Sequence, residues 1–343
     1  MQHDIAVECQ NVWKIFGYKE RDALSAVRYD GLSKQEVLAR FDCVVGVADV
    51  SFNVRQGEIF CIMGLSGSGK STLVRHINRL IEPTDGVITV SGQDVNKLTP
   101  AELRDFRARK IGMVFQNVAL LPHRNVRDNV AIALELRGVG KKARHAIAEE
   151  KLALVQLEDW ADKWPGELSG GMKQRVGLAR ALAADPEILL MDEPFSALDP
   201  LIRHELQKQF LHLAAVMKKT TIFITHDLEE AIRLGTHIAI MKDGKVVQIG
   251  TAEEIVMDPK DDYVANFVAG ISRLHLATAG RVMEALGEDT VSNACPRVTT
   301  DTKLNELIGL SCNTEHPIVV VSDNHPVGII TKNTLLRSLQ SNR

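Results

Sequence analysis

A glycine-rich segment beginning at residue 64 is the part of the sequence best suited to chemistry. It fits the pattern GxxxxGK(S/T) and consists of Gly64, Leu65, Ser66, Gly67, Ser68, Gly69, Lys70, Ser71 and Thr72. The apolar run 58–63 precedes it, and a helical pattern starts near Lys70. Glycines let the backbone curl so that consecutive N–H groups point at phosphate oxygens, and a helix N-terminus adds partial positive charge. The segment is therefore predicted to bind the phosphates of a nucleotide.

Two residues of this segment have specific expected tasks. The Lys70 ammonium should reach the β- and γ-phosphates, and the Ser71 hydroxyl should bind Mg²⁺. The alternative is a glycine-rich turn that binds nothing, but the strand before the segment and the helix after it argue against that reading. ATP and Mg²⁺ are thus the expected ligands.

A pair of acids follows a second apolar run. The sequence Ile-Leu-Leu-Met-Asp-Glu ends at Asp192 and Glu193, which is typical of a buried strand that delivers carboxylates at its C-terminal edge. Asp192 is expected to hold Mg²⁺, and Glu193 is the candidate general base that polarises the attacking water. Strands often end in solvated acids, so this pair gains its weight from the phosphate-binding segment elsewhere in the chain.

These groups require an α/β scaffold to position them. Apolar runs of strand length alternate with helical patterns through the first two-thirds of the chain, which predicts a parallel sheet flanked by helices. Capping boxes, Ser33 with Glu36 and Thr99 with Glu102, predict two helix starts. Strands are expected at 58–63, 86–90, 110–115, 188–191, 221–225 and 237–241.

Three further segments stand apart from this core. Residues 18–45 form an insertion with one capped helix expected, and from about 117 to 168 the sequence becomes helical and charged, which predicts an inserted helical subdomain. Residues 274–343 predict a small α+β domain that ends in strand (318–321), turn (322–326), strand (327–330) and helix. We therefore expect a nucleotide-binding domain over 1–270 and a second domain over 274–343.

The composition excludes several classes of protein. The chain has 343 residues, and no apolar run approaches the ~18–20 residues that a membrane-spanning helix needs. The N-terminal residues lack an apolar segment and include Asp4, so we expect no signal peptide and a cytoplasmic location. Five scattered cysteines without a CxxC pair argue against a disulfide framework and a zinc site. A net charge of -3 gives no electrostatic case for nucleic acid as the main partner.

A second helix start distinguishes between the families that carry such a phosphate loop. The sequence Leu-Ser-Gly-Gly-Met at 168–172 precedes the helical run KQRVGLARALAAD. Together with the run Ser-Ala-Leu-Asp that ends at Asp199, and with His226 after the strand TTIFIT, it resembles the ABC ATPase family over roughly residues 5–270. The resemblance implies a P-loop NTPase fold of the ABC type. Met172 stands where glutamine is commoner in that family.

The resemblance assigns roles to three residues outside the phosphate loop. Gln116 resembles the glutamine that touches Mg²⁺ and communicates with a membrane subunit. His226 resembles the histidine that contacts the γ-phosphate and positions the water, and Phe16 resembles the aromatic residue that stacks on adenine. A lone histidine at a strand end and a lone aromatic are usually structural, so these roles depend on the whole set of motifs.

The Leu-Ser-Gly-Gly-Met signature also implies a dimer. Ser169, Gly170 and Gly171 open a helix, which makes a second anion-binding terminus, yet in this fold it lies too far from its own phosphate loop to share one nucleotide. A partner chain must supply it. Ser169, Gly170, Gly171, Met172 and Asp199 are therefore expected to act on ATP in trans, within a two-fold homodimer.

Longer matches narrow the resemblance to one kind of transporter. The insertion GLSKQEVLARFD, with KIFG and VALLPHRNV, resembles the ATPase subunit of glycine betaine/proline-type importers, whose relatives serve choline and other ammonium osmolytes. The end of the chain, HPIVVVSDNHPVGIITKNTLLRSL, resembles part of a CBS domain, and the length of 274–343 allows only one. This resemblance implies a separate membrane permease, a substrate-binding protein and a peripheral position at the cytoplasmic face of the inner membrane.

The alternative is a non-transport ABC ATPase that acts on DNA or ribosomes. Such chains usually carry two cassettes or a long coiled coil between the phosphate loop and the signature. The sequence between Lys70 and Leu168 is short and has no heptad run, which favours the transporter.

Overall fold

The computed structural model describes residues 5–340 apart from 197, 273, 275, 287–294 and 323–324. They form two compact units, 1–249 and 250–343. The division falls before the predicted domain boundary at 270, because helix α10 (Ala252–Met257) joins the C-terminal segment: Met257 packs on its core, and Glu253 accepts hydrogen bonds from Thr278. The nucleotide-binding domain as a functional unit over 1–270 stays a prediction.

A six-stranded sheet forms the centre of the first unit, in the order β10-β9-β3-β8-β7-β6. Its strands are β3 (Ile59–Met63), β6 (Ile111–Val114), β7 (Ile188–Asp192), β8 (Thr220–Thr225), β9 (His237–Lys242) and β10 (Lys245–Gly250). Every residue of β3, β7 and β8 is buried, as continuous apolar runs in a parallel sheet require. Five of the six predicted strands lie here, and the α/β fold class is confirmed.

The sixth predicted strand belongs to a different sheet. Residues 86–90 fall in β4 (Asp85–Val90), which pairs antiparallel with β1 (Ile5–Phe16) in a four-stranded sheet of order β2-β1-β4-β5. The other strands are β2 (Val44–Arg55) and β5 (Gln93–Asp94). The parallel placement was wrong, since the long strand β1 offers β4 an antiparallel edge. The rings of Phe52 and Phe60 stack with centroids 5.1 Å apart, which joins the two sheets in one core.

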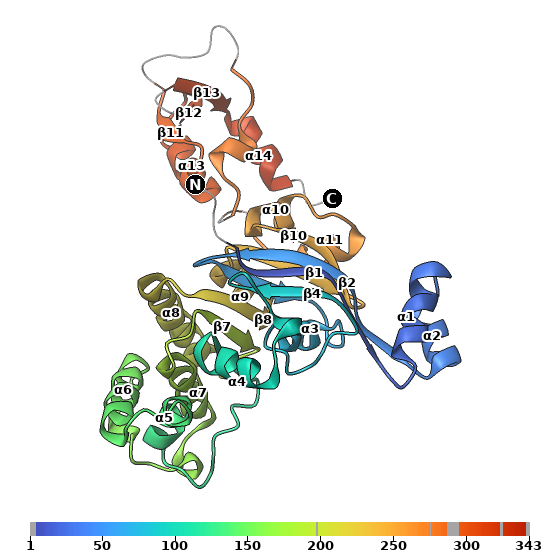
Figure 1. Cartoon of the computed structure of the whole chain (residues 1–343). Helices are drawn as coiled ribbons and strands as arrows, with labels where there is room; N and C mark the ends of the chain where they lie inside the picture. The colour runs from blue at the N-terminus through green and yellow to red at the C-terminus, as the bar shows by residue number, and fades with distance from the viewer. Residues whose placement is uncertain are drawn as a thin grey trace. The chain divides into compact units, whose positions relative to one another are not determined.

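Helices cover the sheets of this unit (Figure 1). Helix α3 (Lys70–Ile77) packs against β4, β7 and β8, and α9 (Leu228–Leu234) against β3 and β8. Helix α4 (Pro100–Arg109) follows a 3₁₀ turn, η1 (Val95–Lys97), and begins at the predicted capping box of Thr99 and Glu102. Helix α8 (Pro200–Met217) joins β7 to β8.

The insertion between β1 and β2 forms two helices where one was predicted. They are α1 (Glu20–Tyr29) and α2 (Lys34–Phe41), and the predicted capping box of Ser33 and Glu36 opens the second. A small core that includes Ile15, Leu24 and Val37 holds the pair against the ends of the two strands. Both helices stand at one end of the antiparallel sheet (Figure 1).

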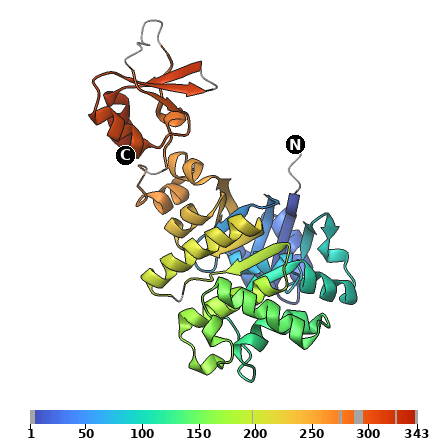
Figure 2. The same ribbon diagram turned by 90° about the vertical axis from the view of Figure 1, so that its left-hand side faces the viewer.

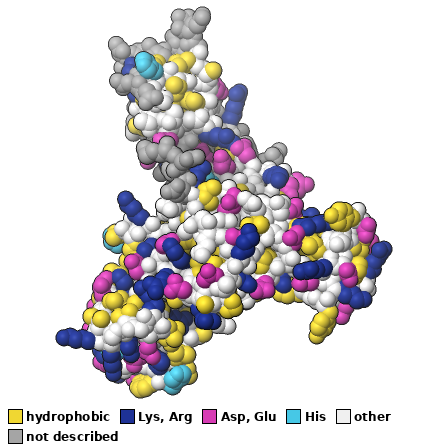
Figure 3. Space-filling view, viewed as in Figure 1, with side chains coloured by type: hydrophobic (Ala, Val, Ile, Leu, Met, Phe, Trp, Pro, Cys, Tyr) yellow, Lys and Arg dark blue, Asp and Glu magenta, His cyan; other side chains and the backbone are white. Residues whose placement is uncertain are grey.

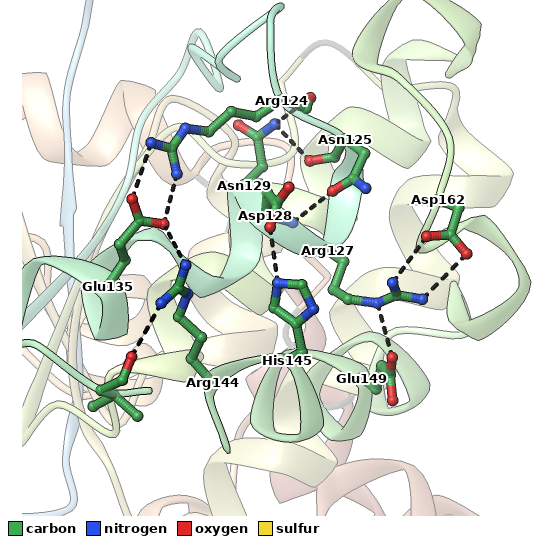
Figure 4. Close-up of polar contacts among 11 residues, drawn as sticks. Arg124, Asn125, Arg127, Asp128, Asn129, Glu135, Arg144, His145, Glu149 and Asp162 are labelled. Atoms are coloured by element: carbon green, nitrogen blue, oxygen red, sulfur yellow. Dashed lines mark hydrogen bonds and ion pairs between the residues drawn. The ribbon is translucent and has the colours of Figure 1, made fainter. Parts of the chain in front are cut away.

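A helical subdomain is present, and it extends beyond the predicted end at residue 168 because α7 packs against α5 and α6. It consists of α5 (Val126–Leu136), α6 (Lys141–Leu154), the 3₁₀ turns η2 (Glu158–Trp160) and η3 (Pro165–Glu167), and α7 (Gly170–Ala183). Figure 2 shows these helices, in green, gathered at one end of the unit. Ion pairs join them (Figure 4). Arg127 pairs with Glu149 and Asp162, and Glu135 pairs with both Arg124 and Arg144.

The second unit contains a three-stranded sheet of order β11-β12-β13. The predicted strand, strand and helix at its end correspond to β12 (Ile318–Ser322), β13 (His325–Ile330) and α14 (Lys332–Gln340), while positions 323–324 of the predicted turn lie outside the described residues. The remaining elements are α10, α11 (Asp262–Val268), α12 (Ala279–Val282), β11 (Arg297–Thr299) and α13 (Leu304–Cys312). The resemblance to a CBS domain stays a prediction.

The surface is mixed in charge. On the face that Figure 3 shows, basic and acidic side chains are interspersed over the inserted helices and the helical subdomain. None of the described helices is long and apolar enough to cross a membrane.

A cluster of three aromatic rings ties the segment after Glu193 to the core, and it provides a test of the packing. Phe223 of β8 is fully buried, with ring centroids 5.8 Å from Phe195 and 6.2 Å from Phe210. Truncation to alanine leaves a cavity that its neighbours fill poorly. We expect Phe223→Ala to lower the free energy of unfolding by about 3–5 kcal/mol, measured by urea denaturation, with Phe223→Leu as the milder control. Equal stability of the alanine variant and the wild type would contradict this packing.

Candidate functional site

An open cleft of about 760 Å³ lies at the C-terminal edge of the parallel sheet. Chain segments far apart in sequence meet there, as expected at the carboxyl ends of strands in an open α/β sheet. Among the predicted site residues, those that line it are Phe16, Leu65, Ser66, Gly67, Gly69, Lys70, Ser71, Thr72, Gln116, Glu193 and His226. The sequence reasoning missed Val44, Val45 and Gly46, which also line it.

The phosphate-binding segment adopts a conformation that only glycine permits at key points. Gly69 has φ +98° and caps α3, and a Cβ there would lie 2.3 Å from the Gly46 carbonyl oxygen. Gly64 has φ +149°, and its Cβ would lie 2.2 Å from the Met241 carbonyl oxygen. Gly64 and Ser68 support the loop from behind and do not line the cleft. Because β2 and β9 lie this close to the loop, glycine is required at both Gly64 and Gly69.

The Lys70 ammonium is held by the loop itself. Its Nζ donates to the carbonyl oxygens of Gly64, at 2.8 Å, and Leu65, at 3.1 Å. Burial lowers the pKa of Lys70, and the carboxylates of Glu193 and Asp192 oppose this effect. A buried cation at the first turn of a helix, facing an open cleft, is suited to receive phosphate oxygens.

Asp192 lies beneath the cleft with its carboxylate fully paired. It is 1% exposed, and its two oxygens accept from Ser71 Oγ, at 2.8 Å, and Arg75 Nη2, at 3.2 Å. Ser71 and Arg75 are four residues apart on α3, so they project from one helix face. The sequence reasoning missed Arg75: its spacing from Ser71 was readable, but its pairing with Asp192, 117 residues away, was not. Hydroxyl and carboxylate oxygens are the ligands that Mg²⁺ prefers, so Ser71 and Asp192 fit that ion.

Glu193 has a strained backbone that its neighbours hold in place. Its φ is +47°, in the left-handed region, which costs a non-glycine residue about 1–3 kcal/mol. The Glu193 amide donates to the Ile224 carbonyl, and its carbonyl accepts from the amide and hydroxyl of Ser196. The strain aims the carboxylate into the cleft, where Oε2 lies 3.1 Å from His226 Nδ1 and 3.4 Å from Gln116 Nε2. The three side chains predicted to be catalytic therefore meet at one point.

Phe16 stands at the rim of the cleft, at the end of β1. Its side chain is 40% exposed rather than buried in the core. Lys14 Nζ lies 5.2 Å from the ring centroid, and Gly46 approaches the ring edge. An exposed ring beside the phosphate-binding loop is available to stack on a planar base.

The residues predicted to act in trans do not line the cleft. Ser169 caps α7 by accepting from the Met172 amide at 3.3 Å, and Ser169 and Gly170 are exposed. Asp199 is also exposed and precedes α8 without making a side-chain cap. These residues therefore lie outside the lining of their own chain's cleft, and their role in trans stays a prediction.

Known proteins resemble this chain along most of its length. A family model described as ABC transporter matches residues 47–196. The glycine betaine/proline betaine transport system ATP-binding protein of Escherichia coli is 52% identical over 78% of this chain, and the match spans 66% of that relative's length. The trimethylamine N-oxide transport system ATP-binding protein of Ruegeria pomeroyi is 46% identical over 94% of this chain and 93% of its own.

Solved structures share the fold. A dimeric bacterial ABC transporter cassette matches 72% of this chain and 98% of its own, with a TM-score of 0.62 and 32% identity. A post-hydrolysis dimer of an ATP-binding cassette bound to ADP and phosphate matches with a TM-score of 0.61. Because the cleft, the fold and a relative aligned almost end to end agree, this chain belongs to the ABC transporter family of ATP-binding proteins.

Proposed function

We propose that the chain is the ATP-hydrolysing subunit of an importer for quaternary or tertiary ammonium osmolytes. The observation that carries this proposal is the cleft in which the phosphate-binding loop faces Gln116, Glu193 and His226. A loop that binds phosphate and a carboxylate beside it are the two requirements of nucleotide hydrolysis.

Each group in the cleft has a proposed task. The loop amides and Lys70 bind the β- and γ-phosphates, and Phe16 stacks on adenine. Glu193 accepts a proton from the attacking water, while His226 and Gln116 hold its carboxylate and the water in line with the γ-phosphate. Ser71, Asp192 and Gln116 would hold Mg²⁺, which when bound neutralises charge on the phosphates.

The proposed working unit is a homodimer. The cleft is open and lacks the anion-binding helix start at Ser169, Gly170 and Gly171. A partner chain would bring that helix start, with Met172 and Asp199, against the ATP bound in the cleft. Each ATP would then lie between two chains, so binding joins the chains and hydrolysis releases them. The dimeric structures of similar cassettes support this arrangement.

The cargo is inferred from the relatives. They are named for transport of glycine betaine, proline betaine, trimethylamine N-oxide, choline and carnitine. The shared chemistry is a fully substituted nitrogen with positive charge. An integral membrane permease and a separate substrate-binding protein would select the cargo, and this chain would sit peripherally at the cytoplasmic face of the inner membrane.

The proposed base is tested by Glu193→Gln. The amide keeps the size of the side chain but cannot accept a proton, so hydrolysis should fall by about 10²-fold or more. ATP binding should persist, and the variant should accumulate as an ATP-bound dimer, detected by size-exclusion chromatography with ATP. Turnover near the wild-type rate would exclude Glu193 as the base.

Sharing of sites is tested by mixing two inactive variants. Ser169→Arg damages the signature and Lys70→Ala damages the phosphate loop, so each homodimer has two defective sites. In a mixed dimer both defects fall on one site and the other site is intact, so hydrolysis that neither variant shows alone should return in part. Each variant alone is the control. No recovery in verified mixed dimers that bind ATP normally would show that the signature does not act in trans.

The cargo class is tested in proteoliposomes that contain this chain together with its permease and binding protein. We expect ATP-dependent uptake of at least one of glycine betaine, proline betaine, choline or trimethylamine N-oxide. Lys70→Ala should abolish this uptake because it removes phosphate binding. If the wild-type assembly hydrolyses ATP but transports none of these solutes, the cargo class is wrong while the ATPase assignment stands.

A further inference from the structure

The segment that follows Gln116 is attached along one face of helix α7. Residues 116–125 have no regular secondary structure. Three residues of α7, spaced by three, touch the start of this segment: Gln174, Gly177 and Arg180. This spacing places them on one face of the helix.

Arg180 makes the strongest of these contacts. Its guanidinium donates to the carbonyl oxygens of Val118, at 2.5 Å, and Ala119, at 3.0 Å. Burial lowers the pKa of Arg180 from its ordinary value, as expected for a guanidinium that has exchanged water for protein partners. The two terminal nitrogens of the planar fork each bond one of two consecutive carbonyls, a geometry that the single nitrogen of a lysine does not reproduce.

The other two residues bring the segment close to the helix. A Cβ at Gly177 would lie 2.5 Å from Val118 Cγ1, so glycine is needed for this approach. Gln174 Nε2 donates to the Gln116 carbonyl at 3.4 Å. The backbone of Gln116 itself is therefore in contact with α7.

The far end of the segment is fixed by Asn129 of α5. Asn129 is fully buried. Its side-chain oxygen accepts from the backbone N–H of Leu121, and its side-chain nitrogen donates to the carbonyls of Leu121, Arg124 and Asn125, at donor–acceptor distances of 2.7–3.1 Å. Figure 4 shows Asn129 beside Arg124 and Asn125. Held at both ends, the segment cannot absorb a displacement of α7 by flexing freely.

The N-terminus of α7 is the signature at Ser169. One rigid helix thus carries, at its start, the group proposed to act on the partner's ATP and, along its face, the anchor of Gln116 in the chain's own cleft. We propose that Arg180 is a positioning residue that couples these two sites. Engagement of Ser169 with the partner's nucleotide would shift the backbone of Gln116 and so alter its contact with Glu193, and the two ATP sites of a dimer would act together. This inference rests on the proposed function.

The test compares Arg180→Met with a matched variant at the other end of the same helix. Arg137 donates to the carbonyl of Ala184, the C-cap of α7, at 2.9 Å, and does not line the cleft. Arg137→Met therefore removes a similar guanidinium–carbonyl bond without touching the segment after Gln116. The readouts are kcat, the Hill coefficient for ATP, ATP affinity of the single chain, and amide hydrogen exchange at 117–121 and in the phosphate loop.

We expect Arg180→Met to lower the Hill coefficient below that of the wild type, toward 1, and kcat by about 10-fold, within the range of typical coupling energies. ATP affinity of the single chain should change less than about twofold, since the phosphate loop is intact. Exchange should rise at 117–121 but not in the phosphate loop. Arg180→Lys, which keeps the charge but replaces the fork by a single nitrogen, should be intermediate, and Arg137→Met should behave as wild type.

Two outcomes would overturn the proposal. One is a wild-type Hill coefficient and kcat in Arg180→Met, or in Arg180→Lys if the methionine variant does not fold. The other is an equal loss in Arg137→Met, which would mean that both arginines only stabilise the helix. If the wild-type protein hydrolyses no ATP, the proposed function is refuted instead. Raised amide exchange at 117–121 in Arg180→Met would still show that Arg180 holds this segment.

Discussion

A buried carboxylate at the end of β7 is the constraint on which the cleft depends. Asp192 is almost completely removed from water, and a buried charge is tolerated only when it is paired. Ser71 and Arg75, one turn apart on α3, satisfy its two oxygens. The same contact sets the distance between the helix that carries the phosphate loop and the strand that delivers Glu193. The phosphate-binding and acidic sides of the cleft therefore share one anchor.

The strained residue Glu193 directly follows this anchor. Asp192 is the last residue of β7, and the chain leaves the strand at Glu193. Its left-handed backbone is held by hydrogen bonds to Ile224 and Ser196. Three fully buried aromatic contacts beyond it keep the segment from relaxing. The cost of the conformation is offset by the surrounding core rather than by the residue itself.

The helical subdomain is built as a rigid attachment to this core. Ion pairs centred on Arg127 and Glu135 join its helices, and His145 Nε2 lies 2.9 Å from Asp128 (Figure 4). Two links join it to the core: the segment after Gln116, which α7 and Asn129 hold on either side, and α7 itself, which packs on β6 and continues into β7. A rigid body attached through well-anchored links transmits displacement instead of dissipating it.

The sequence alone determined the features that depend on local chemistry. The phosphate loop, the buried strands, the acid pair and the capping boxes at Ser33 and Thr99 follow from residue type and short spacing. Tertiary structure decided what depends on partners distant in sequence. The antiparallel placement of β4 required the edge of β1, the pairing of Asp192 with Arg75 required α3 to lie beside β7, and the attachment of Gln116 required Arg180 of a helix about sixty residues away. No local pattern encodes these contacts, because each exists only when long-range packing brings its two segments together.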